Sequence, residues 1–264
     1  MKFYAVSDLH LDIHSIRPDF WIDFDRDAVL VIAGDTANSL NGIAYIKNIL
    51  CKHFRIVILI AGNHEWYTSK NKSYDESACI YSFPPKSRVN PNYQTVLKNS
   101  PLARLKTHAN TTENLIFLDN EITTIDGFTI YGGTLWFPIH TYSHELIEKY
   151  ALLMNDAKFV NYRIIEEQYK AFVNNFPQAV DLVISHHLPC RNAFASPQYA
   201  HSSYAPFYCA NLSDELISRA RFWIAGHQHD ANETTISHTT IFICNPKGSI
   251  AMKPGLLKNI AYYL

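Results

Sequence analysis

The chain has 264 residues with a formal net charge of −1, 47% hydrophobic residues and 18% charged residues. This composition excludes an intrinsically disordered or collagen-like chain, and the length allows a core that needs no disulfide framework. The near-zero charge disfavours a dedicated nucleic-acid-binding protein, whereas the 13 histidines raise the question of a metal site.

Short apolar runs, each followed by a polar cluster, recur along the chain and predict strands that are buried on both faces. They cover residues 2–6, 28–33, 55–61, 181–184 and 221–225. Between the second and third runs, residues 39–54 have near-helical apolar spacing, and we expect Ser39 to cap this helix. A strand, a helix and a strand at this spacing predict a βαβ unit and therefore an α/β fold.

The middle of the chain contains three further segments. Residues 122–131 predict a hairpin with Asp126-Gly127 as its turn, and residues 142–175 predict two amphipathic helices. Residues 68–110 are interrupted by prolines and predict an irregular segment that wraps the surface near the site.

No linker-like composition divides the sequence, so we expect one domain over residues 1–264. No stretch of about 18 apolar residues predicts a membrane span, and the N-terminal apolar run is too short for a signal peptide. The five cysteines form no Cys-x-x-Cys motif, which favours free thiols of a reducing compartment. These features predict a cytoplasmic protein with no membrane partner.

Polar side chains that can bind metals follow all five predicted strands, and ligands of open α/β sheets bind beyond the carboxyl ends of strands. In Asp8-x-His10 and His227-x-His229, the two-residue offset lets both side chains converge if the chain stays extended. Carboxylate, amide and imidazole ligands without a thiolate suit Mn, Fe, Zn or Co. Each motif alone can be a turn or a buried histidine, but five successive strand ends together favour a metal site.

Five sequence blocks at these strand ends resemble the signature of the calcineurin-like metallophosphoesterases. They are Ser7-Asp8-Leu9-His10, Gly34-Asp35, Gly62-Asn63-His64-Glu65, Ser185-His186-His187 and Gly226-His227-Gln228-His229. Cys244-Asn245-Pro246-Lys247-Gly248-Ser249 resembles a late loop of that family, and Thr134-Leu135-Trp136 resembles a segment of its small single-domain members. The resemblance implies a two-sheet α/β sandwich flanked by helices, with a dimetal site at the C-terminal ends of strands.

The resemblance also implies which residues bind two divalent transition-metal ions. The first ion would be bound by Asp8, His10, Asp35 and His229, and the second by Asp35, Asn63, His186 and His227, with Asp35 bridging.

Two positions leave a choice open. Asn38 stands where the family often has Asp, and we expect it to weaken a local hydrogen bond or charge without abolishing metal binding. Either His186 or His187 could be the ligand. We choose His186, which follows the strand directly, and expect His187 to face the substrate.

The function implied by the resemblance is hydrolysis of a phosphodiester or phosphomonoester by a metal-bound water or hydroxide. We expect a turn after Gly62-Asn63 to bring His64 over the substrate, where it would hydrogen-bond a phosphate oxygen or protonate the leaving group. Trp66 is a candidate for stacking against a nucleobase or an aryl leaving group, although core packing is the commoner role of such a residue.

A small-molecule or nucleotide ester is the favoured substrate. A nuclease acting on DNA or RNA is the second reading, disfavoured by the net charge of −1. A catalytically silent binding scaffold of the same fold is the third, disfavoured because every expected ligand is present.

Overall fold

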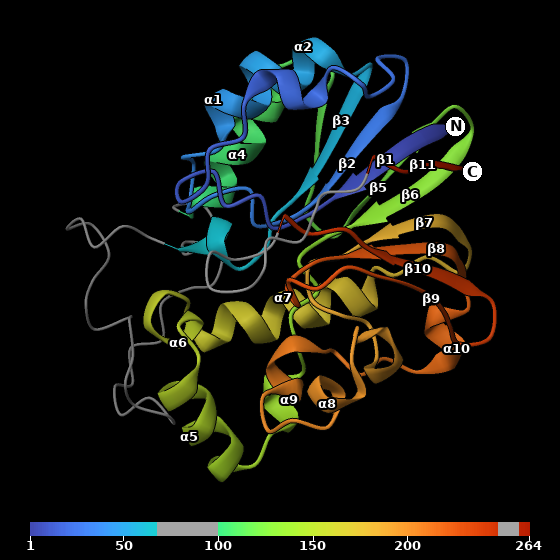
Figure 1. Ribbon diagram of the computed structural model, residues 1–264. Helices are drawn as coiled ribbons and strands as arrows, with labels where there is room; N and C mark the ends of the chain where they lie inside the picture. Colours follow the sequence, from blue (N-terminus) through green and yellow to red (C-terminus); the bar gives the residue numbers. More distant parts are fainter. Residues whose placement is uncertain (68–99, 248–258) are drawn as a thin grey trace.

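The computed structural model describes residues 1–67, 100–247 and 259–264, which form two β-sheets with helices on their outer sides (Figure 1). The strands are β1 (Lys2–Val6), β2 (Val29–Ala33), β3 (Ile56–Ile60), β4 (Leu115–Leu118), β5 (Glu121–Ile125), β6 (Phe128–Gly132), β7 (Val180–Ile184), β8 (Ala220–Ala225), β9 (Asn232–Ile236), β10 (Thr240–Cys244) and β11 (Ala261–Tyr263). The first sheet has the order β11-β1-β2-β3-β4 and the second β5-β6-β7-β8-β10-β9. The predicted α/β sandwich is therefore confirmed.

The helices lie on the two outer faces (Figure 1). Those on the first sheet are α1 (Ile43–Tyr45), a π-helical turn (Ile46–Leu50), α2 (Cys51–His53) and α4 (Pro101–Asn110). Those beyond the second sheet are α5 (His144–Leu153), α6 (Asp156–Phe159), α7 (Tyr162–Asn174), α8 (Pro197–Ala200), α9 (Ala205–Tyr208) and α10 (Asp214–Ile217). Short 3-10 turns cover Pro18–Trp21, His64–Trp66, Ile139–Thr141 and Arg191–Ala193.

The continuous apolar runs of β1, β2 and β3 follow from burial on both faces. Alternate residues such as Phe3 and Val31 point into the core between the two sheets. Their neighbours, such as Tyr4 and Ile32, pack in a second core under α1, α2 and α4. Since both faces are covered, both sets of side chains must be apolar. The five predicted strands are found as β1, β2, β3, β7 and β8, to within one residue at either end.

The helix predicted over residues 39–54 begins later than expected. Its first residue is Ile43, and Gly42 occupies the N-cap position without a side-chain cap. Ser39 instead has a positive φ of 55°, and its N–H donates to the carbonyl of His64 at 3.0 Å. The prediction that Ser39 caps the helix is therefore wrong, because a contact with the loop after β3 holds this residue instead.

The hairpin over residues 122–131 is confirmed as β5 and β6, which pair antiparallel with Ile125 opposite Phe128. The two turn residues, Asp126 and Gly127, have φ angles of 52° and 82°. Positive φ at both central residues is the requirement of a type I′ turn, which Asp-Gly meets at low cost.

Two of the predicted segments need correction. The 142–175 region holds α5, α6 and α7, three helices rather than two, because the Asn161 side chain accepts a hydrogen bond from Arg163 N–H and starts α7 anew. The irregular segment expected over 68–110 is wrong for 101–110, which form α4 behind Pro101. Its remaining part, 68–99, lies outside the described residues.

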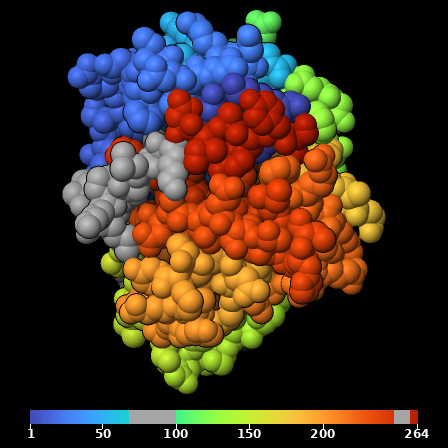
Figure 2. All heavy atoms as spheres, turned by 45° about the vertical axis from the view of Figure 1, so that its right-hand side comes forward, coloured from blue at the N-terminus to red at the C-terminus, as the bar shows by residue number. Residues whose placement is uncertain are grey.

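The C-terminal strand closes one edge of the first sheet. β11 pairs antiparallel with β1, with Phe3 opposite Tyr262, and the ring centroids of these two residues lie 5.5 Å apart. Figure 2 shows the C-terminal residues (red) on the surface against the N-terminal residues (blue). Within the described ranges, no helix is long and apolar enough to cross a bilayer.

Candidate metal centre

The parallel strands bring five polar strand ends to one place. β1, β2 and β3 run parallel in the first sheet, and β7 and β8 run parallel in the second. The residues that follow them form two groups of side chains whose ligand atoms lie within 4.8 Å of one another in each group. The first group is Asp8, His10, Asp35 and His229, and the second is Asp35, His186 and His227. Asp35 belongs to both.

The backbone at these strand ends is left-handed, not extended. Asp8, His10, Asp35, His227 and His229 have φ angles of 52°, 43°, 53°, 68° and 58°. A left-handed conformation costs roughly 1–2 kcal/mol per non-glycine residue, so the surrounding contacts must hold it in place. The extended chain that was the condition for convergence at Asp8-x-His10 and His227-x-His229 is therefore not found, although the side chains do converge.

Backbone hydrogen bonds hold these turns. The Asp8 N–H donates to the carbonyl of Gly34 at 3.1 Å, and the His10 N–H donates to the carbonyl of Asp35 at 3.0 Å. Gly62 is also required here, because a Cβ at this position would lie 2.2 Å from the Asp35 Oδ1 atom. The loops after β1, β2 and β3 are thus fitted closely around one carboxylate.

In the first group, the Asp8 carboxylate is fully buried and accepts from Ser7 Oγ at 2.5 Å and from His227 N–H at 3.1 Å. The Nε2 atom of His229 lies 3.4 Å from Asp8 Oδ1 and 3.3 Å from the Nε2 atom of His10. Two imidazole nitrogens that face one another beside a carboxylate form a pattern that a shared cation would stabilise.

In the second group, His186 is fixed by its two ring nitrogens. The Nδ1 atom lies 2.8 Å from the carbonyl oxygen of Ala33, to which Nδ1–H donates. The Nε2 atom lies 3.3 Å from Asp35 Oδ2 and 2.9 Å from Asn63 Oδ1. An imidazole whose Nδ1–H is bound to a carbonyl presents its Nε2 lone pair to a metal. The amide oxygen of Asn63 thus joins this group.

The charges at the centre favour a cation. Burial opposes ionisation of Asp35, but His186 and His64 outweigh it and hold the Asp35 pKa well below its usual value. Burial likewise opposes ionisation of Asp8, but the hydrogen bond and charge of His229 lower its pKa. Burial would also lower the His186 pKa, yet the Asp35 carboxylate raises it to about 10. Two ionised, buried carboxylates therefore sit where positive charge is stabilised.

A buried nitrogen atom supports the same conclusion. His227 Nε2 has no hydrogen-bond partner among the described residues. Burial lowers the pKa values of His10 and His227, which keeps both rings neutral. Neutral imidazoles, carboxylates and an amide oxygen are the donor set of a divalent transition-metal ion, so these residues fit such ions.

His64 lies at the rim of this centre. Asn63 has helical backbone angles and His64 begins a 3-10 turn, so the chain turns after Gly62-Asn63. The His64 Nε2 atom lies 3.8 Å from Asp35 Oδ2, and 23% of the side chain is exposed. Its ring stacks on Tyr67 with centroids 4.5 Å apart. His64 is thus a mostly buried imidazole with one accessible side, next to the carboxylate that both groups share.

Asn38 holds the other nitrogen of this ring. The His64 Nδ1 atom lies 2.8 Å from Asn38 Oδ1, and Asn38 Nδ2 donates to Asp12 Oδ2 at 2.5 Å. Asn38, which stands where the family often has Asp, therefore keeps a hydrogen bond to His64 and lacks only the negative charge. Asp12, which accepts from the Asn38 amide, supplies a negative charge on the side of Asn38 away from His64.

His187 and Trp66 offer no surface to a substrate. His187 is 0% exposed and packs between Trp136 and His227, with ring centroids 4.8 and 4.3 Å away. Trp66 is 2% exposed and donates through Nε1 to Thr134 Oγ1 at 3.1 Å. The expectation that His187 faces the substrate is therefore wrong, and Trp66 has the packing role rather than the stacking role.

Glu65 is a supporting residue of the centre that the sequence motifs did not single out. Its buried carboxylate accepts from the backbone N–H groups of Asp35 at 2.9 Å, Thr36 at 2.7 Å and Gly62 at 2.7 Å. Burial and the nearby Asp35 raise the Glu65 pKa to about 7. Glu65 thus ties the ends of β2 and β3 together, and its place directly after Asn63-His64 was the available signal.

Asp156 was also missed. This buried residue of α6 accepts from Asn63 Nδ2 at 2.7 Å and from Tyr67 Oη at 2.5 Å. With its nitrogen bound to Asp156, the Asn63 side chain must point its oxygen toward His186. No sequence signal marks Asp156, since 93 positions separate it from Asn63.

Comparison with known proteins supports this description. The family model described as calcineurin-like phosphoesterase matches residues 1–231. A curated relative, the uncharacterized protein L509 of Acanthamoeba polyphaga mimivirus, is 26% identical over 257 residues, covering 85% of this chain and 83% of the relative.

One solved structure is similar in fold, and a second is a weaker match. The phosphopantetheinyl hydrolase of Mycobacterium tuberculosis superposes with a TM-score of 0.64 at 15% identity, covering 94% of this chain and 89% of that one. A dimetal phosphatase from Danio rerio has a TM-score of 0.45 at 14% identity, covering 92% and 86%. At such identities the hydrolase shows the fold alone. Because the family model spans all five sequence blocks and the structure gathers them beyond the carboxyl ends of strands from both sheets, this chain belongs to the calcineurin-like phosphoesterase family.

Proposed function

We propose that this protein hydrolyses a phosphodiester or phosphomonoester with two divalent transition-metal ions, of which Mn, Fe, Zn and Co are the candidates. One ion would be held by Asp8, His10, Asp35 and His229, and the other by Asp35, Asn63, His186 and His227. The observation that carries the proposal is the buried Asp35 carboxylate, which belongs to both groups of ligand atoms. A shared carboxylate relieves the repulsion between two dications.

When bound, such a pair of ions stabilises charge on the phosphoryl oxygens and lowers the pKa of a coordinated water from 15.7 toward about 7. The chain itself orients the ligands. Ala33 fixes the ring of His186, and Asp156 fixes the amide of Asn63. Asn63 contributes a neutral oxygen, so the site keeps enough positive charge to attract a phosphate.

We assign to His64 the transfer of a proton to the leaving oxygen. The Asn38 oxygen accepts from Nδ1–H and holds the ring, so Nε2 is the nitrogen that faces the centre beside Asp35. In the protonated ring, Nε2–H is a donor that can bond a phosphate oxygen or protonate the departing group. A small-molecule or nucleotide ester remains the proposed substrate, since the net charge of −1 does not favour a nucleic acid.

Metal content and hydrolysis together test this function. We expect about two transition-metal ions per chain by elemental analysis, since seven ligand residues form two groups that share Asp35. Chelation should abolish hydrolysis of a panel of phosphate esters, and adding back Mn or Zn should restore it. At most a trace of metal after dialysis with both ions would contradict the two-metal site. Full metal content without any hydrolysis would contradict the enzymatic function and indicate a catalytically silent binding scaffold.

The Asp156 contact gives a further prediction. Asp156→Ala removes the acceptor that orients Asn63, so metal affinity at the second position should fall by about 10–100-fold. Tyr67→Phe removes the hydrogen bond from Tyr67 to Asp156 and the longer one of 3.2 Å from Asn63 to Tyr67, but it leaves the Asn63–Asp156 bond of 2.7 Å, so this comparison variant should lose less affinity. Titration with Zn would measure both variants. Equal losses in the two, or none in Asp156→Ala, would contradict the orienting role.

A further inference from the structure

A cavity of about 380 Å³ lies between the segment that contains α8 and α9 and the loop after β8. Its walls are aromatic and polar: Phe194, Gln198, Tyr199, Tyr204, Tyr208 and Gln228 line it. A volume near the lower end of the usual range for ligand pockets, about 300–1,000 Å³, suits one part of a small molecule. The Tyr199 and Tyr204 side chains are 41% and 43% exposed, so the cavity is accessible from solvent.

This cavity shares a wall with the metal centre. The Tyr208 ring lies over the His227 ring, with centroids 4.3 Å apart and planes inclined by 32°. Gln228, which lines the cavity, lies in sequence between His227 and His229. Its amide accepts from Ala195 N–H at 2.8 Å and donates to the Ala193 carbonyl at 3.3 Å. The wall is therefore fixed to the loop that carries two proposed metal ligands.

The lining indicates what the cavity accepts. None of its lining residues carries a formal charge at neutral pH, so a second phosphate or another ion would find no counter-charge there. Aromatic side chains favour a flat ring, which gains from stacking whatever its identity. Tyrosine hydroxyls and the Gln198 amide can bond polar ring edges.

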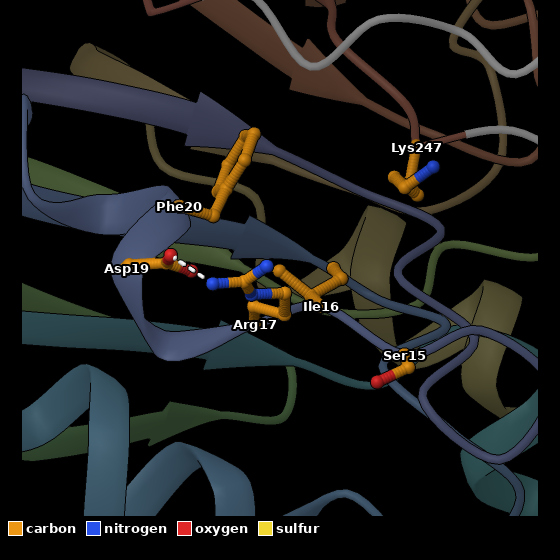
Figure 3. A pocket seen from close by; sticks show the side chains of 6 residues that line it. All are labelled: Ser15, Ile16, Arg17, Asp19, Phe20 and Lys247. Carbon is orange, nitrogen blue, oxygen red and sulfur yellow. Dashed lines mark hydrogen bonds and ion pairs between the residues drawn. The ribbon is translucent and has the colours of Figure 1, made fainter.

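A second cavity of about 380 Å³ differs in chemistry. It is lined by Ser15, Ile16, Arg17, Asp19, Phe20 and Lys247 (Figure 3). Figure 3 shows Arg17 turned toward Asp19, with an ion pair of 2.6 Å, and Lys247 on the opposite side. With one aromatic residue and three charged ones, this cavity does not offer a stacking surface on several sides, and it serves as the comparison site.

We propose that the cavity lined by Tyr199, Tyr204 and Tyr208 binds an uncharged, planar aromatic ring of the substrate, while the phosphoryl group lies at the metal centre. The substrate is thus a phosphate ester with a nucleobase or an aryl group close to the phosphorus. The proposal rests on the proposed phosphoesterase function. Among the described residues, only the Tyr208 ring, which lies 4.3 Å from the His227 ring, stands between the cavity and this metal ligand, and this closeness is the reason to assign the ring and the phosphate to one small molecule.

Ring binding is tested without catalysis. Adenosine and benzyl alcohol, with glycerol as the ringless control, are added to the Zn-loaded full chain, and saturation-transfer NMR reports contact. We expect transfer to a ring compound and none to glycerol. A signal from adenosine alone indicates a nucleobase, and one from benzyl alcohol alone an aryl group. Tyr199→Ala and Tyr204→Ala should reduce the signal. No transfer to either ring compound would overturn the proposal.

Hydrolysis supplies the second test. Methyl, benzyl and thymidine-5′ phosphates, as monoesters and as methyl diesters, carry only primary alkoxide groups on phosphorus and differ in whether one of these groups bears a ring. Tyr204→Ala should raise KM about tenfold for a ring-bearing ester and leave the methyl ester unchanged, as expected for loss of one stacking contact. Tyr204→Phe keeps the ring and should behave as the parent. Phe20→Ala, in the comparison cavity, should change nothing.

The outcomes separate this proposal from the proposed function. If every ester is hydrolysed and the ring-bearing esters gain nothing over the methyl ester, the ring subsite is wrong and the phosphoesterase function stands. If no ester is hydrolysed while ring binding depends on Tyr204, the subsite stands and the function fails. A KM increase in Phe20→Ala without one in Tyr204→Ala would place the ring in the other cavity and overturn the proposal.

Discussion

Asp35→Asn should lower turnover by about a thousandfold or more and reduce the metal content of the purified protein from about two ions per chain. Two bound ions contribute several kcal/mol of transition-state stabilisation, and each 1.4 kcal/mol corresponds to a factor of ten in rate. The asparagine amide keeps one oxygen and loses the charge shared by both ligand groups. Elemental analysis and the rate on a phosphate ester measure the two effects.

Asn38→Ala is the matched control for this substitution. Asn38 lies in the same loop, but it contacts His64 and Asp12 and belongs to neither ligand group. Its metal content should therefore remain near two ions per chain. Thermal unfolding of Asp35→Asn should accompany the assay, because His186 loses its nearest carboxylate in this variant. If the two substitutions cost the same in metal and in rate, the bridging role of Asp35 is wrong.

His64→Ala should keep both metal ions and slow hydrolysis of an alkyl phosphate ester by about 10²–10⁴-fold. The same variant should hardly slow a nitrophenyl ester, because nitrophenolate leaves without a proton. The ring of His64 stands beside Asp35 but outside both ligand groups, which is why metal content should not change. Rates on the two esters and elemental analysis of the same preparation give the comparison.

Two other results for His64→Ala would lead to different conclusions. Equal loss on both esters with intact metals would make His64 a hydrogen-bond donor to the phosphate rather than an acid. Loss of metals would remove His64 from the catalytic residues.

Asn38→Ala removes the acceptor that holds the His64 ring, so this variant should show a weaker form of the same leaving-group dependence. Asn38→Asp keeps an acceptor there and should retain the parent rates. No leaving-group dependence in Asn38→Ala would mean that the ring needs no such support.

The sequence alone determined the parts of this protein that depend on local pattern. Buried parallel strands must be apolar on both faces, so β1, β2, β3, β7 and β8 could be located from composition. Side chains that can bind metals could be recognised directly after these strands, because the residue type determines which donor atoms a side chain offers. The Asp-Gly turn between β5 and β6 could also be found from residue type, because few residues tolerate positive φ at these two positions.

The tertiary structure decided what depends on contacts between distant segments. Asp156 orients Asn63 from 93 positions away, and Tyr208 forms the wall between His227 and a cavity that no motif marks. The roles of His187 and Trp66 also depended on burial, because the sequence does not show whether a histidine or a tryptophan lies in the core or at the surface. Left-handed backbone at the strand ends, rather than extended chain, brings the ligands together. Such strain is stable only where packing from both sheets enforces it, and therefore no local pattern reveals it.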